Sequence, residues 1–424
     1  MVGYGPDALV AVRPFAQQRE GDSVTIGDLE RQVFLSIPAE GLDILDSLST
    51  GNTVGEAARR YEQKYGETPD IDDFLQVLAA EGFVASHVAT SNGGRDTKPA
   101  PAPRWTWTAS WITPAIARRV SSWPVAVICV AAVVFSVYLV ANDPPLFKDA
   151  SILLFPEHFA ALTWATVALS LIGVLIHELG HLVTARATGV PTRIGFGNRL
   201  YYIVAETHMT EIWLRPKRER YRAFLAGPLI DLTTISSLII FRSAGRQGWI
   251  EVPWAVDQLA AALVFVTTIR FVWQTFLFVR TDFYYVIATM FNCKNLMADT
   301  EVFLRNMFAR LRRSGNVVDQ SGIPPKEMRT VRSYALVWLV GRAIAIGVLL
   351  IVIFPLLFGY ITEGVRYLTG QPSLFGTIDF LTIVALSFIF QGGGVLLWMR
   401  SIYRGRKDRQ RSGSIPQREP VSAP

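Results

Sequence analysis

The sequence contains only two cysteines among its 424 residues, Cys129 in an apolar run and Cys293 in a polar segment. Two such cysteines cannot supply a disulfide framework, which excludes a fold held together by disulfides. The amino-terminal stretch also lacks a basic segment followed by an apolar one, so no cleaved signal peptide is expected. We therefore expect the residues before the first apolar run to stay in the cytoplasm.

Apolar residues, in contrast, are abundant: half of the chain is hydrophobic, with 11 Trp and 25 Phe, and the mean hydropathy is +0.30. This composition is too apolar for a soluble multidomain protein of this size and indicates a membrane protein. The formal net charge is +6, but the Lys and Arg residues lie beside apolar runs and form no groove interleaved with aromatic residues. The placement of the Lys and Arg residues therefore predicts the orientation of the chain in the membrane. It does not predict a nucleic-acid partner.

The sequence contains six apolar runs between residues 124 and 399. Each run is long enough to cross about 30 Å of hydrocarbon as a helix. They cover Pro124–Ala141, Phe159–Ala185, Ala223–Phe241, Val256–Val279, Tyr334–Ile361 and Phe375–Met399. The successive connections hold one, eight, two, nine and one Lys or Arg residues, and seven follow the last run. Because cytoplasmic loops carry the positive excess, residues 121–400 predict a mainly α, six-helix bundle spanning the cell (inner) membrane with both termini in the cytoplasm.

The second run contains the sequence HELGH, which places His177, Glu178 and His181 inside a membrane segment. Residues four apart share one face of a helix, so the two histidines can bind one tetrahedral Zn²⁺, with Glu178 as general base toward water that the metal acidifies. The alternatives are a chance match and histidines satisfied within an ordinary core. Two histidines and a glutamate in hydrocarbon are costly unless they bind something, which favours the metal site.

The zinc ion needs a third protein ligand at a similar depth. Counted from the cytoplasmic end of the second run, His181 lies about 7 Å and His177 about 13 Å into the membrane at the helical rise. Asp282, just past the fourth run on the same side, is the best-placed carboxylate. Asp299 and Glu301 lie further into the loop, where we expect them to be solvated.

Four further polar residues interrupt the apolar runs: Asp231, Arg270, Arg342 and Gln391. At the helical rise each lies about 13 to 15 Å from the cytoplasmic edge, level with the first histidine. Polar groups at that depth should face a partner or water, so we expect a hydrated cavity around the zinc, with Asp231 paired to Arg270. The alternative is that the helix ends are displaced by a turn and some of these side chains reach the interface.

Residues 1–90 predict a small soluble α+β domain. Two strands, VTIGD and QVFLSIP, precede helical patterns at Ala39–Ser47, Thr53–Tyr65 and Asp70–Glu81. Thr53 with a glutamate three residues later forms a capping box, and Gly66 ends that helix. This combination of short strands and three short helices describes a winged-helix module of a size that folds alone.

Three connecting regions complete the chain. Residues 91–120 predict a flexible Gly- and Pro-rich linker followed by a tryptophan-rich interfacial segment. The aromatic and β-branched residues between Pro191 and Leu214 predict a β-hairpin, in which His208 is expected to be a loop residue because HELGH already supplies both imidazoles. Residues 401–424 predict a basic, disordered cytoplasmic tail.

Three motifs in order resemble the site-2 protease family of intramembrane zinc metalloproteases over roughly Trp164–Leu296. They are HELGH, LAGPLIDL at Leu225–Leu232, and an aspartate after a later apolar run. The resemblance implies a hairpin that presents an extended substrate to the site. It carries the family's zinc ligands and catalytic glutamate over to His177, His181, Asp282 and Glu178.

The chain departs from that family at two positions. The family's third ligand is the Asp of an LDG motif, whereas this chain has Thr281-Asp282-Phe283. The family's GPxxN motif has Asp231 in place of its asparagine. The stretch that begins TDFYYVIATM is instead similar to a subgroup described as peptide zinc metalloproteases, which also carry PqqD-like domains.

The amino-terminal domain itself resembles PqqD-like peptide-recognition domains, from VTIGD to the end of the third helical pattern. The resemblance implies that a leader peptide adds as a strand to the edge of the sheet. A winged helix that binds DNA is the alternative. Against it, the stretch IDDFLQVLAAEGFV is acidic and offers no Lys or Arg to phosphates.

These observations predict a zinc metalloendopeptidase that matures a ribosomally synthesised, modified peptide. The expected partners are a peptide or protein substrate, the lipid bilayer, and export or peptide-modification machinery. A second hypothesis is cleavage of a membrane-bound regulator, which a transmembrane substrate and a dispensable amino-terminal domain would favour. A third is a non-catalytic membrane peptide receptor or export partner, which the intact HELGH motif disfavours.

Overall fold

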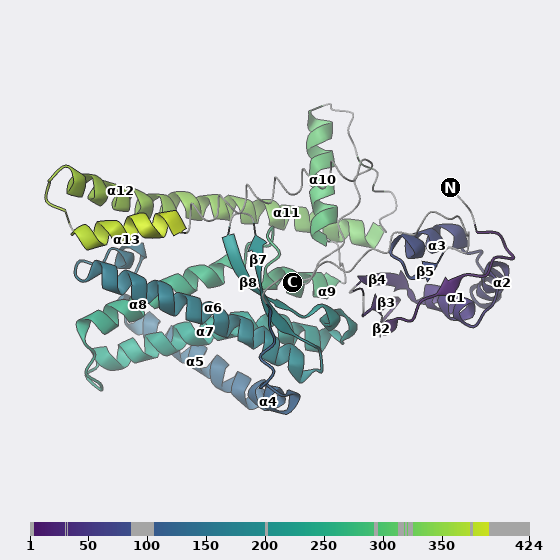
Figure 1. Ribbon diagram of the computed structural model, residues 1–424, viewed down its shortest axis with the longest axis horizontal. Coiled ribbons are helices and arrows are strands. Elements are labelled where there is room, and N and C mark those ends of the chain that lie inside the picture. The colour runs from purple at the N-terminus through teal and green to yellow at the C-terminus, as the bar shows by residue number, and fades with distance from the viewer. Residues whose placement is uncertain are drawn as a thin grey trace. The chain divides into compact units, whose positions relative to one another are not determined.

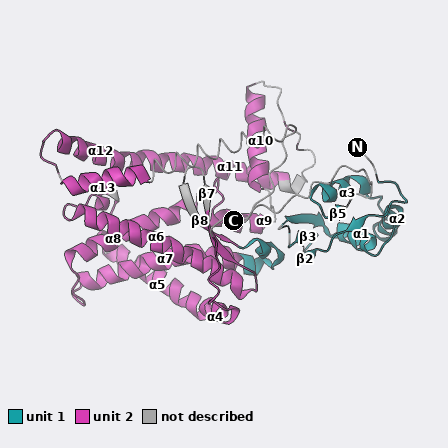
Figure 2. Cartoon of the chain, viewed as in Figure 1, with its two compact units in different colours: residues 1–104, 209–220, 422–424 teal, residues 105–208, 221–421 magenta. Residues whose placement is uncertain are grey.

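The computed structural model describes residues 4–85 apart from 30 and 32, 106–291 apart from 200 and 201, 296–312, 318, 320, 325–373 and 376–389. The chain divides into two compact units (Figure 2). Unit 1 holds residues 1–104, 209–220 and 422–424, and unit 2 holds residues 105–208 and 221–421. The described elements are mainly helical, as the composition predicts (Figure 1).

Unit 1 consists of small antiparallel sheets and short helices. One sheet has the order β2–β3–β4 and a second pairs β1 with β5. The strands are β1 (Ala11–Val12), β2 (Ala16–Glu20), β3 (Ser23–Asp28), β4 (Val33–Pro38) and β5 (Val84–Ala85), and the helices are α1 (Ala39–Ser49), α2 (Val54–Tyr65) and α3 (Ile71–Ala80). The two predicted strands and three predicted helices are all present. Strand β2, with the polar sequence AQQRE, was not predicted because it lacks an apolar alternation.

Local sequence signals set the helix ends in this unit. The Thr53 hydroxyl accepts from the Glu56 main-chain N–H at 3.3 Å, and the Glu56 carboxylate accepts from the Thr53 N–H at 3.0 Å. This is the predicted capping box, and Gly66 closes α2 with a left-handed φ of 76° that favours glycine. The apolar faces of the helices and sheets then enclose one core, whose buried members include Val24, Ile26, Leu45, Leu75, Leu78 and Phe83.

Unit 2 is dominated by helices long and apolar enough to cross a membrane. Among the described residues there are five, at Pro114–Asn142, Phe159–Ala187, Lys217–Arg246, Trp254–Trp273 and Met328–Leu368. They correspond to the first five predicted runs. The sixth run is described only as far as residue 389, and its helix α13 (Thr377–Ser387) is apolar but shorter than a span. The described residues are therefore mainly helical with five candidate membrane-spanning helices, as the prediction requires, and the sixth helix stays a prediction.

The remaining elements of the chain are α4 (Pro114–Val120), α5 (Trp123–Asn142), the 3₁₀ turns η1 (Pro144–Leu146), η2 (Ala150–Leu153) and η3 (Thr210–Leu214), α6 (Phe159–Ala187), α7 (Lys217–Arg246), α8 (Trp254–Trp273), α9 (Asp282–Phe291), α10 (Leu296–Leu311), α11 (Pro325–Val348), the π-helical turn η4 (Leu349–Ile353) and α12 (Phe354–Leu368). The π turn interrupts the fifth span directly before Pro355, which has no N–H to continue the α-helical ladder.

Polar contacts join the apolar helices of unit 2. The hydroxyls of Ser136 and Ser236 lie 2.9 Å apart between α5 and α7. The buried guanidinium of Arg242 on α7 donates to Asp257 on α8 at 2.8 Å. Helix α6 is tied to α13, where the Asp379 carboxylate accepts from a main-chain N–H of α6. These pairs satisfy polar groups that would be costly in hydrocarbon.

A three-stranded sheet lies against α6, the helix that carries the HELGH sequence. Strands β7 (Arg193–Arg199) and β8 (Tyr202–His208) form the predicted hairpin, and β6 (Thr106–Trp107) pairs with β7 on its other side. The Arg186 guanidinium at the end of α6 donates to main-chain oxygens of Thr108, Ala109, Ile112 and Thr192. The later part of the segment predicted as linker and interfacial chain is thus a strand and helix α4 anchored beside α6. Of residues 91–104 and 401–424 nothing is described.

Candidate metal centre

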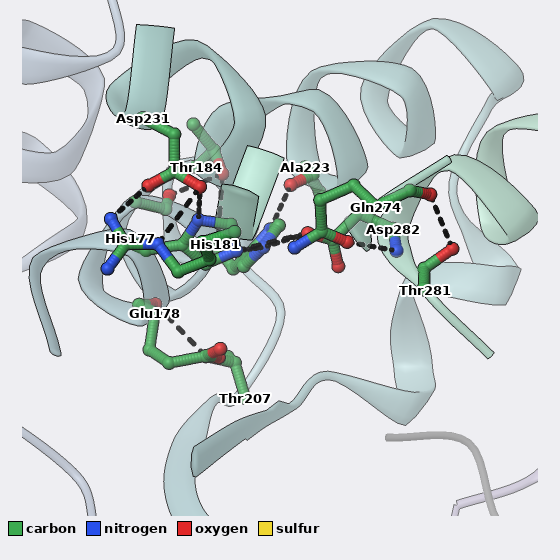
Figure 3. Close-up of polar contacts among 12 residues, drawn as sticks. His177, Glu178, His181, Thr184, Thr207, Ala223, Asp231, Gln274, Thr281 and Asp282 are labelled. Atoms are coloured by element: carbon green, nitrogen blue, oxygen red, sulfur yellow. Dashed lines mark hydrogen bonds and ion pairs between the residues drawn. The ribbon is translucent and has the colours of Figure 1, made fainter. Parts of the chain in front are cut away.

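Three side chains from two distant parts of the chain converge near the carboxy-terminal end of α6 (Figure 3). His177 and His181 project from successive turns of α6, and Asp282 is the first residue of α9. The Nε2 atoms of the two histidines lie 3.2 Å apart, and the Asp282 Oδ2 lies 3.1 Å from His177 Nε2 and 3.2 Å from His181 Nε2. The three atoms therefore form a nearly equilateral triangle.

The hydrogen bonds made by the two Nδ1 atoms, which point away from the triangle, determine how the imidazole rings are oriented. His181 Nδ1 lies 2.7 Å from the main-chain oxygen of Ala223, which can only accept, so Nδ1 carries the proton. His177 Nδ1 lies 2.9 Å from a carboxylate oxygen of Asp231, with the same consequence. Both Nε2 atoms then face the Asp282 carboxylate, where each can hold a proton or bind a metal ion.

The dimensions of the triangle fit one zinc ion. Ligand atoms about 2.0 to 2.1 Å from a tetrahedral zinc lie roughly 3.3 Å from one another. The observed separations of 3.1, 3.2 and 3.2 Å agree with that value. Two histidines and one carboxylate are also a common ligand set of catalytic zinc, with the fourth position left for water or substrate. The geometry thus suits the metal that the sequence motif predicts.

Gly227 on α7 keeps the space beside the two imidazoles open. A Cβ at this position would lie 2.3 Å from His181 Nε2 and 2.4 Å from His177 Nε2, closer than any real contact. Gly180 on α6 similarly permits close packing, since a Cβ there would lie 2.4 Å from the Ile230 side chain. The GP motif that the sequence shares with the site-2 protease family therefore has a steric reason in this chain.

The turn between α8 and α9 holds Asp282 in place without the glycine of an LDG motif. The Gln274 side-chain oxygen accepts from the Asp282 main-chain N–H at 3.2 Å, and the Thr281 hydroxyl donates to the Gln274 main-chain oxygen at 2.8 Å. Burial alone would raise the pKa of the Asp282 carboxyl, but the neighbouring histidines outweigh it and hold that pKa well below its ordinary range. The carboxylate is therefore ionised, as a metal ligand must be.

Glu178 lies next to the ligand group and is held from the hairpin side. Thr207 on β8 donates from its hydroxyl to Glu178 Oε2 at 2.7 Å, and the same hydroxyl lies 3.0 Å from the Glu178 main-chain oxygen (Figure 3). Both side chains are buried. The hydroxyl fixes one carboxylate oxygen and leaves Oε1 as the atom that can take a proton.

Two of the four polar residues predicted to line a cavity lie behind His177. Asp231 is fully buried, and its carboxylate contacts both His177 and the Arg270 guanidinium, with Oδ1 to Arg270 Nη2 at 2.5 Å. The predicted Asp231–Arg270 pair is therefore present. Its carboxylate faces protein groups and not water, so it does not line a hydrated space.

Arg342 does not join this group, and Gln391 lies outside the described residues. The Arg342 side chain is exposed, and its guanidinium carbon lies 4.1 Å from the centre of the Trp338 ring. Cation–π attraction to that ring and to Phe278 accounts for its position. That Arg342 lines a cavity around the zinc stays a prediction.

Sequence reasoning misjudged one residue of this region and missed two others. His208 ends β8 and is not in a loop, and its Nε2 lies 3.9 Å from Glu206 and outside the ligand group. Thr207 and Gln274 were not singled out, because a lone threonine or glutamine carries no spacing signal. The alternation of the hairpin, which turns Thr207 toward α6, was the available clue.

Comparison with known proteins finds no matching family model, no similar curated protein and no similar solved structure. The site itself holds two imidazoles, a carboxylate and, beside them, a buried glutamate.

Replacement of Thr207 tests how Glu178 is held. Thr207→Val removes the hydroxyl at nearly constant volume, and loss of a charge-assisted hydrogen bond of about 1.5 to 3 kcal/mol should lower kcat by about 10- to 100-fold. Bound zinc should not change, because Thr207 contacts no ligand. The measurements are hydrolysis of an unstructured fluorogenic peptide and metal content. Thr207→Ser keeps the hydroxyl and should stay near the parent rate; equal losses in both variants would contradict the account.

Proposed function

We propose that this protein is a membrane-embedded zinc endopeptidase. The observation that supports this most directly is the triangle of His177, His181 and Asp282 ligand atoms with a buried glutamate beside it. The two histidines of the triangle lie on α6, a helix that is long and apolar enough to cross a membrane. The resemblance of its motifs to those of site-2 proteases points to the same chemistry.

The residues of the chain divide the chemical work. His177, His181 and Asp282 would hold a zinc ion, which would supply Lewis acidity for peptide hydrolysis. Glu178 takes a proton at Oε1 from the attacking water and passes it to the leaving amine. Thr207 holds one oxygen of the carboxylate in place, and Gly227 leaves room for a substrate main chain beside the imidazoles.

An extended peptide is the substrate that this arrangement favours. Strand β8 reaches Glu178 through Thr207, so a main chain running beside the hairpin passes the general base. An extended segment exposes its amides, whereas a helix holds them in its own hydrogen bonds. We therefore assign a peptide substrate, with maturation of a ribosomally synthesised, modified peptide as the leading role.

The amino-terminal domain is assigned to recognition of that peptide by strand addition. Strand β3, which contains VTIGD, is central in its sheet and cannot be the docking edge. The edges are β2 and β4, and Glu20 at the end of β2 is already paired with Arg220 within unit 1. Strand β4 (Val33–Pro38) is therefore the edge on which we place the peptide.

The positive-inside distribution supports an inner-membrane protein with its site near the cytoplasmic face. Peptide-modification or export machinery on that side is the expected partner. A non-catalytic receptor remains the alternative from another class. Glu178→Gln separates the two, because a receptor needs no general base whereas a protease does.

The ligand assignment predicts one zinc per chain. His177→Ala, His181→Ala and Asp282→Ala should each lose most of the zinc affinity, because each removes one of three protein ligands. Glu178→Gln should keep the metal and lower peptide hydrolysis by about 10²- to 10⁴-fold. Metal content of the purified variants and their hydrolysis rates are the measurements. An Asp282→Ala protein with normal zinc and normal cleavage would refute the third ligand.

The recognition assignment predicts that residues 1–90 fold alone and bind a precursor peptide encoded beside this gene. All members of the core of unit 1 lie between residues 4 and 84, so the isolated domain retains them. Amide chemical-shift changes should concentrate on β4 and not on β3. Tight binding to duplex DNA with a steep salt dependence, and none to peptide, would overturn the assignment.

A further inference from the structure

Asp231 is the one fully buried carboxylate that touches a histidine of the proposed zinc site among the described residues. It lies on α7, four residues after Gly227, at the position where the site-2 protease pattern has asparagine. Its Oδ2 lies 2.9 Å from His177 Nδ1, on the side of the ring opposite the ligand triangle (Figure 3). A carboxylate in this place acts on the imidazole and not on the substrate.

The contact with Asp231 fixes both the proton and the orientation of His177. A carboxylate oxygen accepts the Nδ1–H, so Nε2 keeps its lone pair for the metal. The negative charge also makes the imidazole a stronger electron-pair donor than one bonded to a neutral group. His181 has only the main-chain oxygen of Ala223 in the corresponding place. The two histidines of the motif are thus supported unequally, and His177 receives the charged partner.

A buried carboxylate is costly unless a cation accompanies it, and Arg270 on α8 supplies that cation. Its Nη2 donates to Asp231 Oδ1 at 2.5 Å and its Nε to Oδ2 at 3.3 Å, a two-point contact that fixes the carboxylate plane. Gly173 on α6 makes room for the guanidinium, since a Cβ there would lie 3.1 Å from Arg270 Nη1. Three helices therefore contribute to holding one carboxylate.

We infer that Asp231 and Arg270 form a positioning pair that holds His177 in its metal-binding state. The inference rests on the proposed zinc site and explains why this chain has aspartate at position 231. An asparagine at position 231 would need no cation, whereas aspartate brings a charge that Arg270 neutralises. Arg270 is directed at Asp231 and the Ser170 main-chain oxygen, so it stabilises the ligand and not an oxyanion on the substrate.

The test compares two ion pairs between the same two helices, each with one buried partner. Asp231→Asn together with Arg270→Gln removes both charges and leaves no buried charge unpaired. Arg242→Gln together with Asp257→Asn does the same to the other α7–α8 pair. Zinc affinity of each purified full-length variant is measured by competition with a chromophoric chelator, and thermal unfolding of the metal-free proteins is measured alongside.

The first double variant should bind zinc about 10- to 100-fold more weakly than the parent protein, the usual effect of losing an outer partner of a metal-binding histidine. The control double variant should bind zinc within twofold of the parent, whatever its stability. Asp231→Ala alone, which removes the acceptor, should weaken zinc at least as much as the first double variant.

Equal zinc affinity in the parent and the first double variant would overturn the inference. An equal loss of zinc affinity in the control double variant would also overturn it, because a general structural role of such ion pairs would weaken zinc binding in both double variants. If either double variant fails to fold, Asp231→Asn measured against Asp257→Asn repeats the comparison with single substitutions. If the parent protein itself binds no zinc, the proposed function fails, and that result is distinguishable from a failure of the positioning pair.

Discussion

The site depends on one constraint: two imidazole nitrogens and a carboxylate oxygen are held within 3.2 Å of one another among apolar helices. Atoms of these kinds at such distances need a shared proton or a metal ion among them. Charged and polar groups in hydrocarbon are otherwise expensive, which makes the arrangement hard to explain as core packing. The surrounding contacts leave space beside the two imidazoles and fix the orientation of their rings.

Those contacts form two layers around the ligands. Directly beside the imidazoles, Gly227 leaves space that any side chain would fill. Further out, each ligand is held by a different partner: His177 by Asp231, His181 by a main-chain oxygen, and Asp282 by the turn that Gln274 closes. Helices α6, α7 and α8 thus meet at the site because each supplies one part of it. A substitution in either layer is expected to act on the metal before it acts on the fold.

Much of this could be read from the sequence, because the signals are local. The HELGH spacing places two histidines on one helix face, and depth counted along the apolar runs selects Asp282 and pairs Asp231 with Arg270. Depth does not fix the rotation of a helix, so it could not foresee that Arg342 lies against the Trp338 ring. Thr207 depends on the register of a hairpin against α6, a contact across many residues that no local pattern specifies. The contact between Asp231 and His177 likewise depends on how α6 and α7 pack against each other, which the sequence alone does not specify.

The central claim is that Asp282 completes a zinc site with the two histidines, and zinc K-edge X-ray absorption tests it most directly. The unaltered protein should show nitrogen and oxygen neighbours at about 2.0 to 2.2 Å, with no sulfur. In Asp282→Cys, one sulfur neighbour should appear at about 2.3 Å, because the thiolate takes the place of the carboxylate. An Asp282→Cys protein that binds zinc through nitrogen and oxygen alone would contradict the account.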